Sequence, residues 1–248
     1  PNKDLVSLGD SVTFEIQGYL TNYYLDFNGW TTDSTYKIYI KAKPGLECTS
    51  TIGAGDAVYD GGTNYLLAPR QRHIVIDGVE LTGGGNQIFQ SNNTQILNCL
   101  IHNTNSRVTI DEGAYLYNCI LYNCGLDNAT SGLGTYTYNT TLEKCTIIAD
   151  VNHGGYNGEM IIRYVTDAKP VHSTVVYNET TGGYNNYFDI TANAATDYNA
   201  DSEGEAPGTN NFTVSQSDFV DYANGNFNIS SSSPLYTAGA GSTSIGAT

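Results

Sequence analysis

The sequence predicts an all-β fold in which successive turns of one chain stack as a coil, forming a solenoid of short parallel strands. Three observations predict it. Short apolar segments recur along the chain, one small or polar residue interrupts each segment, and residues that favour helices are scarce. Gly, Asn, Thr and β-branched residues dominate instead, and these residues favour turns and strands.

The recurring unit is clearest in IDGVEL (76–81), where a glycine separates two apolar halves. The segments LNCLI, LYNCIL, LEKCTI and VHSTVV align beneath it. Self-similarity at a spacing of this order is typical of solenoids. The predicted columns are Val79, Cys99, Cys119, Cys145 and Ser173, with steps of 20, 20, 26 and 28 residues; Ile76, Ile96, Leu116 and Leu142; and Leu81, Ile101, Leu121, Ile147 and Val175.

A column of like residues at a constant place in each repeat predicts turns that stack at the strand spacing of about 4.8 Å. The apolar columns then line the interior, where each side chain packs on its equivalents. Gly78, Asn98 and Asn118 stand at the interruption. These residue types tolerate the left-handed backbone conformation that a sharp corner needs. The interruption is therefore predicted to be a bend between two faces of the coil.

Further short strands are predicted on the remaining face of each turn. The extra length of the later repeats lies between strands, in residues 124–135, 150–159 and 179–186, and insertions in solenoids collect on one side and often bind ligands. The predicted strands of this third face are NQIFQ (86–90), RVTID (107–111), TYTYN (135–139), EMIIRYV (159–165) and YFDIT (187–191).

These units resemble right-handed parallel β-helix proteins of the pectate-lyase-like superfamily. HIVIDGVELTGG (73–84) is similar to the recurrent strand unit of that family, and residues 11–45 are similar to its N-terminal segment. Residues 197–201 and 218–241 resemble the closing segment of phage, viral and bacterial surface members. The resemblance implies one structural domain, a single-stranded right-handed parallel β-helix with irregular loops on one side. We expect an N-terminal cap with the first strands in 1–30, the β-helix in 31–204 and the closing segment in 205–248.

Charge and composition limit the partners. The net charge is −15 and the chain has ten Lys and Arg residues, so we expect no nucleic-acid partner. No stretch approaches the roughly eighteen apolar residues of a membrane span, so no membrane insertion is expected. The surface rich in Tyr, Gly, Asn and Thr favours an extracellular or virion-surface location, and neutral glycans or cations suit the charge. Because the chain begins at Pro1 without Met, we expect a processed product or a fragment.

The five cysteines predict no disulfide framework, because their number is odd. They show no zinc-ligand spacing with histidine partners, so no metal site is predicted. We expect free, buried thiols.

Members of the resembled family include polysaccharide lyases, glycosidases, tailspikes, adhesins and inert spacers, so activity has to be argued from a site. The resemblance implies chemistry on one outer face, with Ca²⁺ held by aspartates and Arg or Lys as the base. Strand alternation predicts an outer row of Asp111, Arg163 and Asp189. Asp111 and Asp189 would lie about 14 Å apart, too far for a hydrolase pair. The catalytic candidates are Arg163, Asp189, Asp150 and His153.

Two simpler interpretations stay open for these residues. Arg163 and Asp189 could form a surface ion pair without a catalytic role, as exposed pairs commonly do. His153 lies in a glycine-rich loop, where a lone histidine is more often solvated than functional.

The loops also carry residues suited to glycans. Tyrosine rings offer flat faces for sugar rings, and asparagine amides offer hydrogen bonds to hydroxyl groups. The alternative is that these tyrosines pack between the chains of an oligomer. The glycan-binding candidates are Tyr136, Tyr138, Tyr156, Asn157, Tyr184 and Tyr187.

The sequence therefore predicts a non-catalytic extracellular or virion-surface β-helix of the fibre, tail or adhesin type, either structural or glycan-binding. Its partners would be a glycan, a cell-surface polysaccharide or neighbouring subunits of a fibre or virion, a homo-oligomer included, and it would need no cofactor. The alternative is a polysaccharide lyase or glycoside hydrolase acting on a surface or acidic polysaccharide, with Ca²⁺ if it is a lyase.

Overall fold

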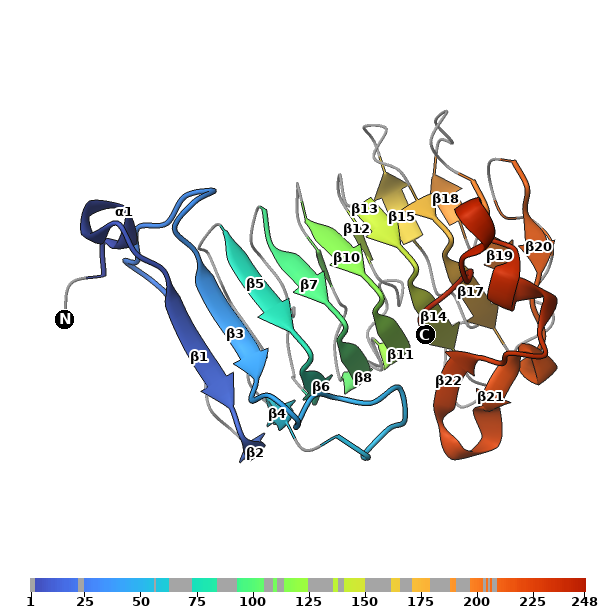
Figure 1. The fold of residues 1–248 in the computed structure, drawn as a ribbon, viewed down its shortest axis with the longest axis horizontal. Coiled ribbons are helices and arrows are strands. Elements are labelled where there is room, and N and C mark those ends of the chain that lie inside the picture. Colours follow the sequence, from blue (N-terminus) through green and yellow to red (C-terminus); the bar gives the residue numbers. More distant parts are fainter. Residues whose placement is uncertain are drawn as a thin grey trace, which may run out of the picture.

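The computed structural model describes residues 3–21, 25–55, 57–62, 73–83, 93–104, 109–110, 114–124, 136–137, 141–149, 162–165, 171–178, 188–190, 197–202, 204, 206 and 209–248. Within these residues the chain is almost wholly β, and its strands stack side by side along one direction (Figure 1). The one α-helix among them is the single turn α1 (Leu5–Leu8). No described helix is long and apolar enough to cross a membrane.

Most strands belong to three parallel sheets. The seven-stranded sheet has the order β1 (Val12–Ile16), β3 (Ile38–Ala42), β5 (Ile74–Asp77), β7 (Gln95–Leu97), β10 (Tyr115–Tyr117), β13 (Thr141–Glu143) and β16 (Val171–His172). The nine-stranded sheet has the order β2 (Gly18–Thr21), β4 (Ala57–Asp60), β6 (Glu80–Thr82), β8 (Leu100–Thr104), β11 (Ile120–Cys124), β14 (Thr146–Ala149), β17 (Val175–Asn178), β19 (Ala200–Asp201) and β20 (Phe212–Thr213). The four-stranded sheet has the order β18 (Phe188–Ile190), β15 (Ile162–Val165), β12 (Tyr136–Thr137) and β9 (Thr109–Ile110).

From β7 to β18 the chain visits the seven-stranded, nine-stranded and four-stranded sheets in turn, four times, and β19 and β20 then extend the nine-stranded sheet. Each strand therefore pairs with its equivalent from the next repeat. Five segments were predicted as strands of the third face, and four of them contain the observed strands of the four-stranded sheet. The fifth, residues 86–90, lies outside the described residues.

The register confirms two of the predicted columns over four repeats. Successive register partners in the seven-stranded sheet are Ile76, Ile96, Leu116 and Leu142. Leu81, Ile101, Leu121 and Ile147 align in the same way in the nine-stranded sheet. These eight side chains are at most 1% exposed, because each apolar side chain covers the next along the stack.

The predicted alignment of the last repeat is wrong by one residue. Val176, not Val175, pairs with Ile147, and Val175 pairs with Thr146. Thr174 therefore takes the place equivalent to Cys145, and Ser173 stands at the bend with a φ of 48°. Serine is small enough for either the bend or the buried position that follows it. The sequence alone therefore did not show which of the two positions Ser173 occupies.

The predicted bends are confirmed by the backbone. Gly78, Asn98 and Asn118 have φ values of 69°, 52° and 52°. The strain of the asparagines is offset by hydrogen bonds between successive bends: Asn98 Nδ2 donates to Asp77 Oδ1 at 2.9 Å, and Asn118 Nδ2 donates to Asn98 Oδ1 at 3.1 Å. Lys144 takes the same conformation in the next repeat, with a φ of 53°.

The main core fills the space between the seven- and nine-stranded sheets. Cys99, Cys119 and Cys145 lie in it, each at most 2% exposed. All five cysteines are free thiols; four are buried, as predicted, and Cys48 is half-buried. Burial raises the pKa of Cys124 to about 12, so that thiol stays protonated.

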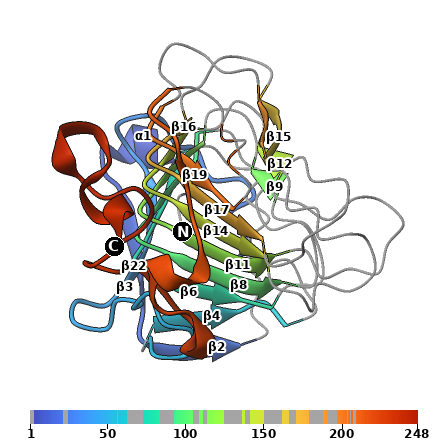
Figure 2. The ribbon, with the colours of Figure 1, turned by 90° about the vertical axis from the view of Figure 1, so that its right-hand side faces the viewer.

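A C-terminal segment, residues 214–248, packs on the outer face of the nine-stranded sheet (Figure 2). It contains the antiparallel hairpin of β21 (Phe219–Asp221) and β22 (Asn226–Ile229) and four short 3₁₀ turns. Phe227 stacks on Tyr122 of β11, with ring centroids 4.6 Å apart. The turns are η1 (Gln216–Asp218), η2 (Tyr222–Asn224), η3 (Pro234–Thr237) and η4 (Ala240–Ser242).

Candidate functional site

The four-stranded sheet brings three of the sequence-predicted candidates into one row. Arg163 is the register partner of Asp189 on the next strand, and Tyr136 is the partner of Arg163 on the strand before. Partners in a parallel sheet lie about 4.8 Å apart and share a face of the sheet. We call Tyr136, Arg163 and Asp189 the candidate row. Its members are a tyrosine, an arginine and an aspartate at register positions on three neighbouring strands.

The structure does not describe the other predicted candidates. All of them lie outside the described residues: Asp111, Asp150, His153, Tyr138, Tyr156, Asn157, Tyr184 and Tyr187.

A second group of tyrosines lies on the outer face of the seven-stranded sheet. Tyr115 and Tyr117 alternate with the buried Leu116 on β10, so both point away from the core, and their ring centroids are 6.2 Å apart with planes inclined by 30°. Tyr39 lies on the same face on β3, because it is in register with Val75, Gln95 and Tyr115. We call Tyr39, Tyr115 and Tyr117 the tyrosine face.

Charged groups fix the orientation of these rings. Lys144 Nζ lies 5.7 Å from the centre of the Tyr117 ring, and Lys41 Nζ lies 4.7 Å from that of Tyr39, both within cation–π range. The Tyr115 hydroxyl donates to Glu143 Oε2 at 2.7 Å. Burial and this hydrogen bond raise the pKa of Tyr115, so the phenol stays protonated and can hold the contact.

The tyrosine face is accessible and carries charges of both signs. Its three rings are half-buried, and in Figure 1 the strands β5, β7 and β10 face the viewer with no other ribbon in front of them. Lys41 and Lys144 lie on this side with three acidic residues, Glu15, Asp77 and Glu143. Our sequence interpretation missed this face, although the alternation of tyrosine and leucine over 115–117 is the signal that could have found it.

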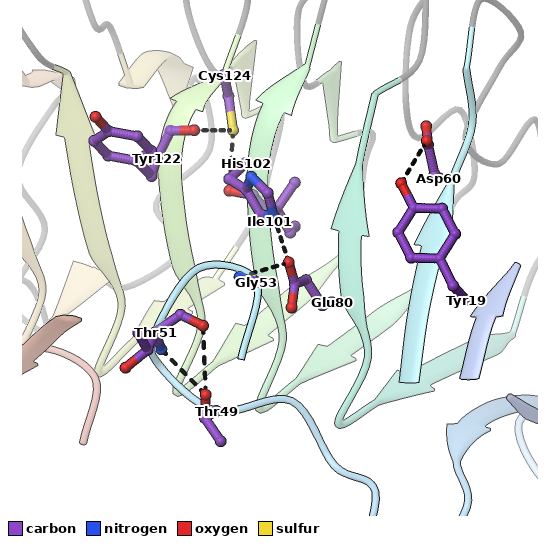
Figure 3. A network of polar contacts seen from close by, with 10 residues as sticks. All are labelled: Tyr19, Thr49, Thr51, Gly53, Asp60, Glu80, Ile101, His102, Tyr122 and Cys124. Atoms are coloured by element: carbon purple, nitrogen blue, oxygen red, sulfur yellow. Dashed lines mark hydrogen bonds and ion pairs between the residues drawn. The ribbon is translucent and has the colours of Figure 1, made fainter. Parts of the chain in front are cut away.

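A buried polar pair lies on the outer face of the nine-stranded sheet. Glu80 Oε1 on β6 is 2.8 Å from His102 Nε2 on β8, and the side chains are 3% and 6% exposed (Figure 3). His102 follows the core residue Ile101 on β8 and so points away from the core, yet it is buried. Glu80 was not singled out, because a glutamate on an outer face is ordinarily solvated.

A loop formed by residues 48–55 covers this pair, and we call it the 48–55 loop. Gly53 N donates to Glu80 Oε1 at 3.1 Å, so one carboxylate oxygen serves both neighbours. A Cβ atom on Gly55 would lie 2.8 Å from Glu80 Oε2 and 3.3 Å from Cys48 Cα, so a larger residue there would require the Glu80 carboxylate to shift. Glu80 Oε2 and His102 Nδ1 are buried without a hydrogen-bond partner in the described part of the chain.

Metal binding and thiol chemistry gain no support from the described side chains. Among the described side chains, no three His, Cys, Asp or Glu residues lie close enough together to bind one metal ion. A pocket of about 70 Å³ lies between the 48–55 loop and the bends, and it is lined in part by Cys48, Asn98 and Asn118. Burial raises the pKa of Cys48, so its thiol there is neutral and a poor nucleophile.

Comparison of the chain with protein-family models, with curated proteins and with solved structures finds no match.

Proposed function

We propose that the chain is a single-stranded right-handed parallel β-helix that acts as a glycan-binding module at a cell or virion surface. The three parallel sheets, the cyclic order in which the chain visits them and the left-handed bends at Asn98 and Asn118 support the coil. Such a coil offers long flat faces on which rows of side chains repeat at the strand spacing. An extended polymer can contact these rows along its length.

The tyrosine face is the observation that carries glycan binding. Tyrosine rings pack on the apolar faces of sugar rings, while the lysine, carboxylate and glutamine groups beside them exchange hydrogen bonds with hydroxyls. From Tyr39 on β3 to Tyr117 on β10 the face spans three strand steps, about 14 Å, which is long enough for several consecutive sugars. Because the lysines of this face are accompanied by at least as many acidic residues and the whole chain carries −15, we assign it a neutral polysaccharide.

Replacing Tyr117 by alanine tests this assignment. We expect affinity for immobilised neutral polysaccharides to fall by a factor of about 2–10, because an aromatic contact adds about 0.5–1.5 kcal/mol beyond its buried area. Biolayer interferometry over a polysaccharide panel measures the change. Tyr236→Ala is the matched control, since Tyr236 is 43% exposed and lies on the C-terminal segment. Equal binding by both variants and the unaltered protein would remove the tyrosine face from consideration.

The candidate row favours a second function, depolymerisation of an acidic polysaccharide. Arg163 opposite Asp189 would combine a base with a carboxylate that could share in holding Ca²⁺ at a uronate, as the family resemblance implies. Arg163→Ala is then expected to slow depolymerisation by about 10²–10⁴-fold, the usual contribution of a general base. Product length with and without Ca²⁺ is the measurement, and Lys43→Ala is the control, because Lys43 is an exposed cation that follows β3 and lies outside the four-stranded sheet. Lack of depolymerisation by the unaltered protein, or full activity of the Arg163→Ala variant, would reject this function.

A further inference from the structure

Two sheets have open edges at one end of the stack, which we call the N-terminal end and define by α1, β1 and β2 (Figure 1). β1 stands first in the seven-stranded sheet and β2 first in the nine-stranded sheet, and no described strand pairs with their outer edges. Val12 N donates to Lys37 O, on the side of β3. Because backbone groups alternate along a strand, the N–H and C=O groups of Thr13 and Glu15 point to the open edge, where both residues are exposed.

The interior of the stack is also partly open at this end. Phe14 belongs to the row that continues through Ile40 and Ile76, which are 1% and 0% exposed, yet Phe14 itself is 36% exposed. Its ring packs on those of Phe27 and Trp30, with centroids 5.6 Å and 6.2 Å away. Phe14 stays accessible because no further turn lies over it in the described part of the chain.

Exposed apolar side chains are concentrated at the same end. Among the described residues, six large apolar or aromatic side chains are exposed, and four of them belong to α1, β1 and β2. A concentration of this kind on a protein surface marks an interaction site, whereas single exposed apolar residues are ordinary. The four are Val6, Leu8, Phe14 and Tyr19.

Charge distinguishes this end of the chain from the other. Residues 1–43 contain four lysines and five acidic residues, whereas residues 179–248, which include β18, β19, β20 and the C-terminal segment, contain eight acidic residues and neither Lys nor Arg. Two N-terminal ends can therefore approach each other without the repulsion that two C-terminal ends would meet. The apolar end also fits a copy of itself better than it fits β20 and the bend before it, where Asn210, Asn211 and Thr213 are polar.

We propose that the N-terminal end is an interface through which two copies of this chain associate about a two-fold axis. Such an interface uses the same surface on both copies, so the exposed apolar side chains of α1, β1 and β2 meet their equivalents and are removed from water. A two-fold axis reverses the strand direction, so the open edges pair in the antiparallel sense. The backbone groups of Thr13 and Glu15 thereby gain partners, and an edge that would otherwise recruit other strands is covered.

Sedimentation equilibrium of the unaltered chain tests the association. We expect a mass that rises with concentration towards twice the 26.7 kDa of one chain. Amide hydrogen exchange in residues 12–16 should slow over the same concentrations, because pairing across the edge protects their N–H groups, while exchange in β10 should not depend on concentration. A chain that stays monomeric up to about 100 μM, or an association that leaves exchange in 12–16 unchanged, would overturn the proposal.

Replacing Leu8 by aspartate tests which surface is used. Leu8 is 55% exposed, so the fold of one chain tolerates a charge there, but the two-fold axis would place two such charges in the interface. We expect the dissociation constant of the dimer to rise at least about tenfold, because each buried charge loses its hydration. Val220→Asp is the matched control, since Val220 is 54% exposed on β21 of the C-terminal segment, and circular dichroism verifies the fold of both variants. Unchanged association of the Leu8→Asp variant, or an equal loss in both variants, would refute the N-terminal interface.

Discussion

Replacing Leu116 by alanine is expected to lower the free energy of unfolding by about 2–5 kcal/mol, the usual cost of truncating a fully buried leucine. Leu116 is 0% exposed and lies between Ile96 and Leu142, its register partners in the strands on either side. The shortened side chain would leave a cavity between two repeats, and residues held in register on both sides have little freedom to fill it.

Urea denaturation followed by circular dichroism measures this loss, with Leu97→Ala as the matched control. Leu97 belongs to the same seven-stranded sheet but lies on its outer face, where it is half-buried. Its truncation should therefore cost distinctly less than that of Leu116. If the two variants were equally destabilised, the division of the sheet into a core face and an outer face would be wrong.

Replacing Phe227 by alanine is expected to cost about 3–5 kcal/mol, since a buried phenylalanine leaves a large cavity. Phe227 is 1% exposed, stacks on Tyr122 and meets the ring of Tyr222 edge-on at 5.4 Å. These contacts tie the C-terminal segment to the nine-stranded sheet, so the substitution should loosen this segment before the rest of the chain.

Thermal unfolding measures the total effect, and limited proteolysis locates it. The Phe227→Ala variant should be cleaved within 214–248 under conditions that leave the unaltered chain intact. Tyr236→Ala, at an exposed aromatic of the same segment, should leave both the melting temperature and the cleavage pattern close to those of the unaltered protein. A Phe227→Ala variant that also does so would show that the segment is held elsewhere.

The repeating strands and their bends could be predicted from the sequence, because their signals are local. Leu116 between two tyrosines shows which side of β10 is buried, and Asn98 and Asn118 identify the left-handed corners. The repeat also predicted that the strands of Arg163 and Asp189 are neighbours, and the two residues are register partners. The error at Ser173 arose because a serine suits both the bend and the buried position that follows it, and only the backbone pairing shows which of the two it occupies.

What covers each outer face was decided only by the tertiary structure. Alternation shows that Glu80 and His102 leave the core, but not that the 48–55 loop buries them. The C-terminal segment covers the outer face of the nine-stranded sheet, whereas the tyrosine face stays accessible. The alternation of residues within the strands does not reveal this difference. The physical reason is the sequence separation of the contacts. The pattern within a strand shows only which of its two sides is apolar. Which segment covers a face depends on contacts such as that of Phe227 with Tyr122, which are more than a hundred positions apart in the chain.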